Sequence, residues 1–310
     1  MTKRPPSALW LAHKPVGATS ASLVDAYRAR FAGDYTLKVS HGGALDPFAE
    51  GLMVLLVGAA NRLFERLHEV PKVYRAEVVW GAETDTCDAG GAVTWRGDMG
   101  AQAGVGPTPA ALEGALDRFV GWTEQVPPHT SNKRVDGERA YVRAHRGEAF
   151  TLPAQRVYCH SARWLAHDLP RASTLELAVR GGFYVRSLAR DLGRALGVGA
   201  HLRALQRDAI GPWRCPAPGA MVSVTGTDVM PWLPLLELTD AEWGAVRRGA
   251  ALPERPPLAP TWPLPAGFPA PAWVRAAHLG RLVALQPRAL APRGAAPSDG
   301  ARAVLLPGGV

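Results

Sequence analysis

Apolar and polar positions alternate most clearly over residues 72–80, where β-forming residues also dominate. An alternation with a period of two predicts a strand that buries one face. The same reasoning predicts strands over residues 9–12 and 175–179, and shorter strand-like runs at 282–285 and 303–306. Strands are therefore expected from the beginning of the chain to its end.

Apolar residues recur at helical spacing in three other segments. Residues 109–119 follow Thr108, whose hydroxyl can cap the first turn of a helix. Residues 22–31 follow Ser20, a second candidate cap. A third helix is expected over residues 187–196, after a strand and a glycine-rich turn.

The character of the chain changes near residue 237. Proline and alanine crowd residues 251–273, and no lysine occurs in this part. We therefore expect a large domain over residues 1–236 and a small β-rich domain over 237–310 with a proline-rich linker. A basic, loop-rich stretch at about 124–150 interrupts the large domain.

Composition and charge narrow the functional classes. The chain has 35 basic and 27 acidic residues, a net charge of +8 and an isoelectric point near 9.8. This balance favours a polyanionic partner such as nucleic acid, although a GC-rich genome would also enrich arginine. Three widely spaced cysteines indicate neither a disulfide framework nor a zinc site. No segment resembles a signal peptide or a membrane span, so a cytoplasmic protein without membrane contact is expected.

A run from His41 to Leu52 contains the strongest candidate for chemistry. It places Asp46 after two glycines and before Pro47, a residue that favours a helix start. Taken alone, an aspartate after a glycine-rich turn is more often a turn or cap residue. The local pattern leaves both interpretations open.

The residues from Gly43 to Leu52 resemble the catalytic signature of TruB-type tRNA pseudouridine-55 synthases. This resemblance implies that Asp46 is the catalytic residue, as a nucleophile toward the base or the sugar or as a base toward the sugar. These routes stay open. It also implies that His41 contacts RNA and helps to extrude the base, although this chain has Gly42 where the family often has threonine.

A second signature of the same family is similar to residues 181–193. It implies that Tyr184 packs beside the target base and that Arg186 pairs with Asp46 and favours its ionised form. Tyr74 lies where the family has a tyrosine that stacks on the base, and Leu205 where it has a leucine over the base. The alternatives are a strand tyrosine, a core leucine and a helix-surface arginine.

The basic stretch at 124–150 resembles the thumb-like insertion of the family and implies RNA contacts through Lys133 and Arg143. The family's lysine-proline loop is matched by Lys14 to Gly17. Residues from about 237 resemble a PUA-like domain that grips the end region of tRNA. A solvated surface loop remains the alternative for the insertion.

The resemblance implies an α+β fold with a mixed, largely antiparallel central sheet flanked by helices, and a C-terminal β-rich PUA-like domain. It implies a monomer that isomerises the uridine of the TΨC arm of tRNA by base flipping, binds the T arm and the acceptor region, and needs no cofactor or metal. A non-catalytic tRNA-binding protein and a metal-dependent hydrolase are the alternatives. The first would need only the basic charge, and the second would need an acidic cluster.

Overall fold

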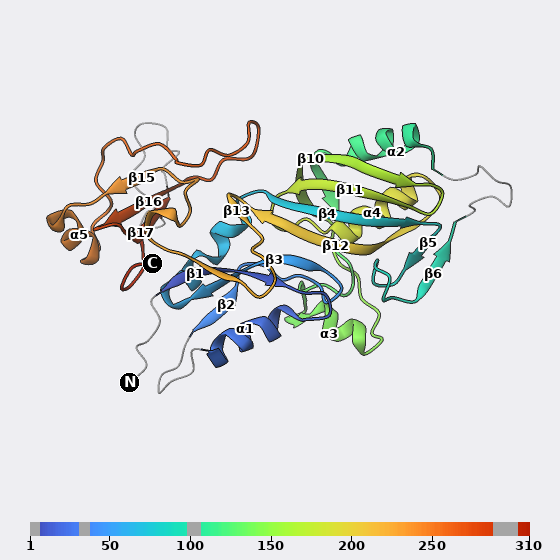
Figure 1. Cartoon of the computed structure of the whole chain (residues 1–310), viewed down its shortest axis with the longest axis horizontal. Coiled ribbons are helices and arrows are strands. Elements are labelled where there is room, and N and C mark those ends of the chain that lie inside the picture. The colour runs from blue at the N-terminus through green and yellow to red at the C-terminus, as the bar shows by residue number, and fades with distance from the viewer. Residues whose placement is uncertain (1–6, 31–37, 98–106, 288–302) are drawn as a thin grey trace. The chain divides into compact units, whose positions relative to one another are not determined.

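The computed structural model describes residues 7–30, 38–97, 107–287 and 303–310 (Figure 1). The chain forms two compact units. The first unit comprises Met1–Val70 and Ala209–Val310, and the second comprises Pro71–Asp208. The last residue of the helix expected over 22–31 lies outside the described residues.

The first unit begins with a small antiparallel group of strands. Strand β1 pairs with β3 from Ala8 opposite Val57 to Lys14 opposite Gly51, and its other edge pairs with β14. The short β2 also pairs with β3. The elements are β1 (Ala8–Lys14), α1 (Ser20–Arg30), β2 (Val39–His41), β3 (Glu50–Val57), η1 (Gly58–His68), β13 (Trp213–Arg214) and β14 (Met221–Val224).

A four-stranded sheet in the order β15-β16-β17-β18 follows in the same unit. Its elements are η3 (Gly226–Asp228), β15 (Leu235–Glu237), α5 (Asp240–Arg247), β16 (Trp273–His278), β17 (Arg281–Pro287) and β18 (Val304–Leu305). Thr239 and Glu242 form a capping box at the start of α5. One apolar cluster includes Leu9 and Leu56 together with Leu285, so this sheet shares a core with the first strands.

The proline-rich segment expected as a linker joins α5 to β16. Trp262 packs against the shared core, and Leu258 exchanges backbone hydrogen bonds with Leu235. The segment is therefore a loop within this part of the chain. The predicted domain boundary at residue 237 falls inside β15 and stays a prediction.

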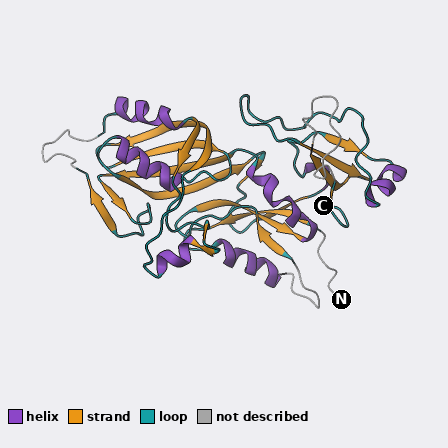
Figure 2. Ribbon diagram, turned by 180° about the vertical axis from the view of Figure 1, so that it is seen from behind, coloured by secondary structure: helices purple, strands orange, loops and turns teal. Residues whose placement is uncertain are grey.

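The second unit is built on strands in the order β12-β4-β11-β10-β7. The printed pairings of β4 with β11, β11 with β10 and β10 with β7 are all antiparallel. Helix α2 contacts β10 and α4, and α4 contacts β4, so both helices cover one face of these strands, as Figure 2 shows. Leu112, Leu177 and Leu192 are buried there.

The bounds of the elements in the second unit locate the candidate residues. They are β4 (Lys72–Trp80), β5 (Ala82–Thr84), β6 (Val93–Arg96), α2 (Pro109–Leu116), η2 (Asp117–Phe119), β7 (Gly121–Gln125), β8 (Arg134–Val135), β9 (Glu138–Arg139), α3 (Ala140–His145), β10 (Gln155–Asp168), β11 (Ala172–Val179), α4 (Val185–Ala195) and β12 (Ala200–Ile210). The predicted strand over 72–80 is confirmed, and Thr108 caps α2 by accepting from the Ala111 amide at 3.2 Å.

Candidate active site

Asp46 lies on the loop between β2 and β3, where it is half-buried. The helix start expected after Pro47 is wrong, because Pro47 and Phe48 form only a turn. The Ala49 amide closes this turn on the Asp46 carbonyl at 3.1 Å, and β3 begins at Glu50. Every residue of β3 after Glu50 is buried, and a short apolar run buried on both faces favours a strand over a helix.

The side of this loop that follows Asp46 is fixed by Lys14, the last residue of β1. Lys14 is fully buried, and its Nζ donates to the Ala49 carbonyl at 2.6 Å and to the Pro15 carbonyl at 3.0 Å. The Gly17 amide donates to the Pro47 carbonyl at 2.8 Å. A buried ammonium group is tolerated only where it is hydrogen-bonded, so these contacts hold the loop carbonyls in place.

The side of the loop that precedes Asp46 is fixed by Ser20. The Ser20 hydroxyl donates to the Leu45 carbonyl at 3.0 Å and accepts from the Leu45 amide at 2.9 Å. Ser20 was expected to cap α1, but it lies inside the helix, and Thr19 accepts from the Ser22 amide at 2.9 Å instead. The backbone on both sides of Asp46 is thus pinned by side chains from β1 and α1.

Gly42 explains why this chain departs from the family pattern. A Cβ atom at Gly42 would lie 2.3 Å from the Cδ1 of Leu67, which is fully buried. The Gly42 amide donates to the Val54 carbonyl at 2.7 Å, so the backbone cannot retreat from this contact without losing a hydrogen bond. His41, the last residue of β2, lies opposite Leu55 and is half-buried.

Tyr74 lies on β4, opposite Leu177 of β11, and only 8% of it is exposed. Its hydroxyl accepts a long hydrogen bond of 3.5 Å from Arg207, another buried residue. Lys72 is buried two positions earlier on the same strand. Burial, and secondarily the charge of Arg207, lower the pKa of Lys72 from 10.5 to about 7.

Tyr184 occupies the residue before the first turn of α4, and Gln125 holds its backbone. The Gln125 side chain accepts from the Tyr184 amide at 2.8 Å and donates to the Tyr184 carbonyl at 3.0 Å. Gln125 is the last residue of β7 and is itself buried. This paired contact fixes the point at which α4 begins.

Arg186 lies in the first turn of α4 and is 4% exposed, which excludes a helix-surface charge. Its guanidinium donates to the Thr86 carbonyl at 2.8 Å, the Thr130 hydroxyl at 2.7 Å and the Thr130 carbonyl at 3.2 Å. The Asp88 carboxylate lies 3.6 Å away. The turn after β5 and the segment after β7 therefore converge on this arginine. The predicted pairing of Arg186 with Asp46 stays a prediction.

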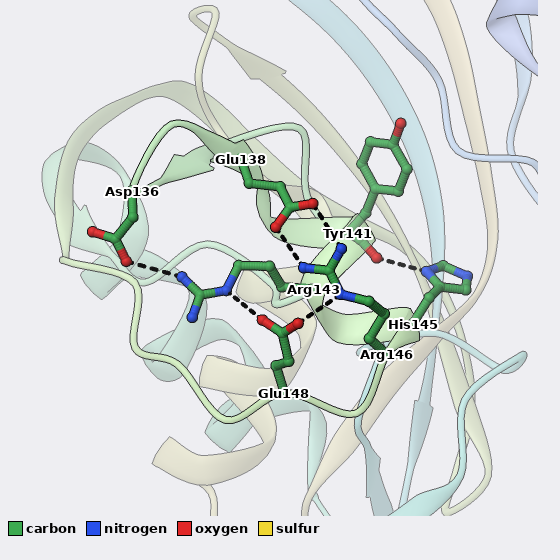
Figure 3. Close-up of polar contacts among 7 residues, drawn as sticks. All are labelled: Asp136, Glu138, Tyr141, Arg143, His145, Arg146 and Glu148. Carbon is green, nitrogen blue, oxygen red and sulfur yellow. Dashed lines mark hydrogen bonds and ion pairs between the residues drawn. The ribbon is translucent and has the colours of Figure 1, made fainter.

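The remaining predicted residues lie on β12 and in the insertion. Leu205 is a buried residue of β12, a position that a core leucine would also occupy. Lys133 is exposed beside the β8–β9 hairpin. Arg143 lies on α3 and forms ion pairs with Asp136 at 3.0 Å and Glu148 at 2.9 Å (Figure 3). The hydrogen bonds of the Glu148 carboxylate to Arg146 and Arg143 lower its pKa.

Asp88, Gln125 and Thr130 were not selected from the sequence. Asp88 was treated as part of a polar turn, and it does serve that turn, because it accepts from the Thr86 hydroxyl at 2.9 Å and the Gly90 amide at 3.0 Å. Its second role, beside Arg186, depends on a contact between segments far apart in the chain. No local signal distinguishes the two roles.

Within the described residues, no three His, Cys, Asp or Glu side chains are grouped so that they could bind a metal ion. No described helix combines the length and the apolar character that a membrane-spanning segment needs.

Known proteins resemble this chain in sequence and in fold. Residues 30–185 match the family TruB family pseudouridylate synthase (N terminal domain). A protein of Roseobacter denitrificans named tRNA pseudouridine synthase B is 42% identical over 207 residues, which cover 66% of this chain and 65% of the relative. A Bordetella pertussis protein of the same name is 38% identical, with 66% of this chain and 80% of the relative covered.

The chain thus spans about two thirds of the length of the first of these relatives. Among solved structures, the crystal structure of a Cbf5-Nop10-Gar1 complex has a TM-score of 0.61 at 22% identity, covering 90% of this chain and 78% of that one. This likeness confirms the expected fold, a mixed sheet with few helices and a β-rich C-terminal part. Together these matches show that the chain belongs to the TruB family of pseudouridylate synthases.

Proposed function

We propose that this protein is a tRNA pseudouridine synthase that isomerises the uridine of the TΨC arm, with Asp46 as its catalytic residue. The reaction cleaves the N-glycosidic bond, turns the base and rejoins it to the sugar through carbon, so it has no net redox change. A single carboxylate fits this chemistry as a nucleophile or as a base. The proposal assigns no cofactor and no metal.

The position of Asp46 on a loop pinned from both sides carries this proposal. Lys14 binds the Ala49 carbonyl, and Ser20 binds both backbone groups of Leu45, so three residues on either side of the carboxylate have little freedom. A catalytic group held in one geometry before the substrate arrives lowers the entropic part of the barrier. A simple turn aspartate would not need a buried lysine and a buried serine to hold its neighbours.

The other proposed roles follow the chemistry of a base taken out of its stack. Tyr74 and Tyr184 offer aromatic faces to the extruded uracil, and Leu205 covers it. Arg186 pairs with Asp46 and keeps it ionised, and His41 contacts the RNA near the extruded base. Lys133 and Arg143 of the insertion bind phosphates of the T arm, and the C-terminal part binds the acceptor region. The protein acts as a cytoplasmic monomer.

The test is to incubate the purified protein with an unmodified tRNA transcript and to map pseudouridine by carbodiimide treatment and primer extension. A single stop in the TΨC loop is expected with the wild type and none with Asp46→Asn. Asp25→Asn is the matched control, because Asp25 is an exposed aspartate of α1 that pairs only with Arg28, one turn along the helix. Turnover by Asp46→Asn at the control rate would disprove the catalytic role. Tight binding without modification by the wild type would instead indicate a tRNA-binding protein.

A further inference from the structure

The insertion contains a small β-hairpin whose turn is set by its sequence. Strands β8 and β9 pair with Val135 opposite Glu138, and Asp136 and Gly137 form the two-residue loop. Both loop residues have positive φ, 51° and 84°. Asp-Gly is favoured in such loops because the turn needs a positive φ at both positions. The hairpin is therefore locally specified.

This hairpin places two arginines directly opposite each other. Arg134 of β8 is the register partner of Arg139 of β9, and both side chains are exposed. Side chains in such a pair start from Cβ atoms only about 5 Å apart, and like charges at directly opposite positions are destabilising. The hairpin thus concentrates two positive charges at one point of the insertion.

Neither arginine has a carboxylate partner among the described residues. Arg134 donates to the Gly137 carbonyl at 2.6 Å, and Arg139 donates to the carbonyl and the side-chain oxygen of Asn132 at 3.4 and 3.3 Å. These neutral acceptors orient the guanidinium groups and leave their charge uncompensated. Each guanidinium carries five donors, so donors remain for a further acceptor.

The acidic residues around the hairpin are committed elsewhere, as Figure 3 shows. Asp136 pairs with Arg143 at 3.0 Å, and Glu138 pairs with Arg146. Glu148 binds both Arg143 at 2.9 Å and Arg146 at 2.6 Å. We call these five residues the clasp. The hydrogen bond from Arg146 is the main cause that lowers the pKa of Glu138 and of Glu148. Because the clasp binds these three acids, none of them neutralises the arginine pair.

We propose that Arg134 and Arg139 together bind one phosphate group of the RNA backbone. A phosphate offers several anionic oxygens, so it can accept from two guanidinium groups at once and remove their mutual repulsion. This inference rests on the proposed RNA substrate and extends it to a pair of residues. The clasp keeps the neighbouring carboxylates away from the pair.

The test measures how binding depends on salt. The Kd of an unmodified tRNA transcript is determined at KCl concentrations from about 50 to about 300 mM, for the wild type and for the double variant Arg134→Gln/Arg139→Gln. The slope of log Kd against log salt should fall by about one phosphate contact in the double variant. Each single variant should weaken binding, and the two losses should not add, because both residues hold one phosphate.

A double variant of equal charge provides the control. Arg163 and Arg171 are exposed and lie near Glu176 and Asp168, at 2.7 and 3.8 Å. Arg163→Gln/Arg171→Gln should leave the slope unchanged. Arg146→Gln breaks the clasp and should expose the insertion to limited proteolysis while it keeps the wild-type slope.

The inference is overturned if the hairpin double variant keeps the wild-type slope, or if the Arg163/Arg171 control lowers the slope equally. Both outcomes are read in a wild type that converts uridine to pseudouridine in the same transcript. A wild type that forms no pseudouridine would overturn the proposed function instead. The two failures are therefore distinguishable.

Discussion

The guanidinium of Arg186 lies 3.6 Å from the carboxylate of Asp88, and both side chains are largely shielded from solvent. Asp88 also accepts from Thr86 and Gly90, so its carboxylate is held by the turn that it belongs to. Removing one member of a shielded ion pair leaves the other charge uncompensated. Asp88 is therefore a positioning residue for Arg186.

Asp88→Asn should lower the turnover of tRNA by on the order of ten-fold or more, with a smaller change in Kd. The amide keeps the shape of the side chain but removes the charge that faces Arg186. Single-turnover rates and binding measured on the same transcript separate the two effects. Asp85→Asn is the control, because the Asp85 carboxylate accepts from the Ala92 amide at 2.9 Å in the same turn. Equal losses in both variants would point to a general defect of the turn.

Ser20→Ala should lower the free energy of unfolding by about 1–3 kcal/mol, since the buried amide and carbonyl of Leu45 lose their partner. Turnover should fall more than tRNA affinity, because the loop that carries Asp46 is loosened. Thermal denaturation and single-turnover kinetics measure the two effects. Ser22→Ala in the same helix removes only exposed contacts with Thr19 and should keep the wild-type turnover. If Ser20→Ala has normal kinetics, the loop does not depend on this serine.

The buried lysine of β4 predicts a pH dependence of stability. The pKa of Lys72 is about 7 in the folded protein and near 10.5 in the unfolded chain, so the unfolded chain binds more protons between these values. The free energy of unfolding therefore rises with pH through this window, as the cost of burying Lys72 disappears. Below the folded pKa the cost is fully present.

Lys72→Met removes this cost, so the variant should be more stable than the wild type near pH 7. Its advantage should shrink by on the order of 1 kcal/mol per pH unit from about pH 7.5 to about pH 9.5. Urea denaturation across this range gives the difference directly. Lys38→Met, at an exposed lysine, should give a constant difference from the wild type. Parallel curves for Lys72→Met and the wild type would contradict the lowered pKa.

Gly42→Ala should destabilise the protein by about 1–3 kcal/mol, because the new Cβ would overlap the buried Leu67 side chain. Shortening that side chain should restore part of the loss. The double variant Gly42→Ala/Leu67→Val is therefore expected to be more stable than the sum of the single changes predicts. Gly114→Ala, at an open position in α2, should be neutral or slightly stabilising. A purely additive double variant would show that the two residues do not clash.

Local patterns predicted the elements whose signal lies within a few residues. The alternation over 72–80 gives β4 with its bounds, and Thr108 caps α2 as expected. Ser20 was misinterpreted because a hydroxyl at a helix start satisfies a cap and a loop contact equally well in the sequence. Pro47 was misinterpreted because its preference for a helix start was outweighed by the buried strand that follows it.

The family resemblance singled out Asp46, Tyr74 and Arg186, but not the residues that hold them. The Arg186 contact with Thr86 joins residues 100 positions apart, and the Gln125 contact with Tyr184 joins residues 59 apart. Such pairs are set by the folded sheet and leave no periodic signal. The same holds for Lys72, whose burial follows from its neighbours across the sheet.

The attachment of the insertion to α4 has a mechanical consequence. Gln125 grips the backbone of Tyr184, and Val126 accepts from Ser187 at 2.8 Å and from Arg190 at 3.0 Å. Thr130 adds its contacts with Arg186. The root of the insertion and the first turns of α4 therefore move as one body. A load on the insertion reaches the start of α4 through these short contacts, so seizing a ligand outside and arranging side chains inside are two ends of one lever.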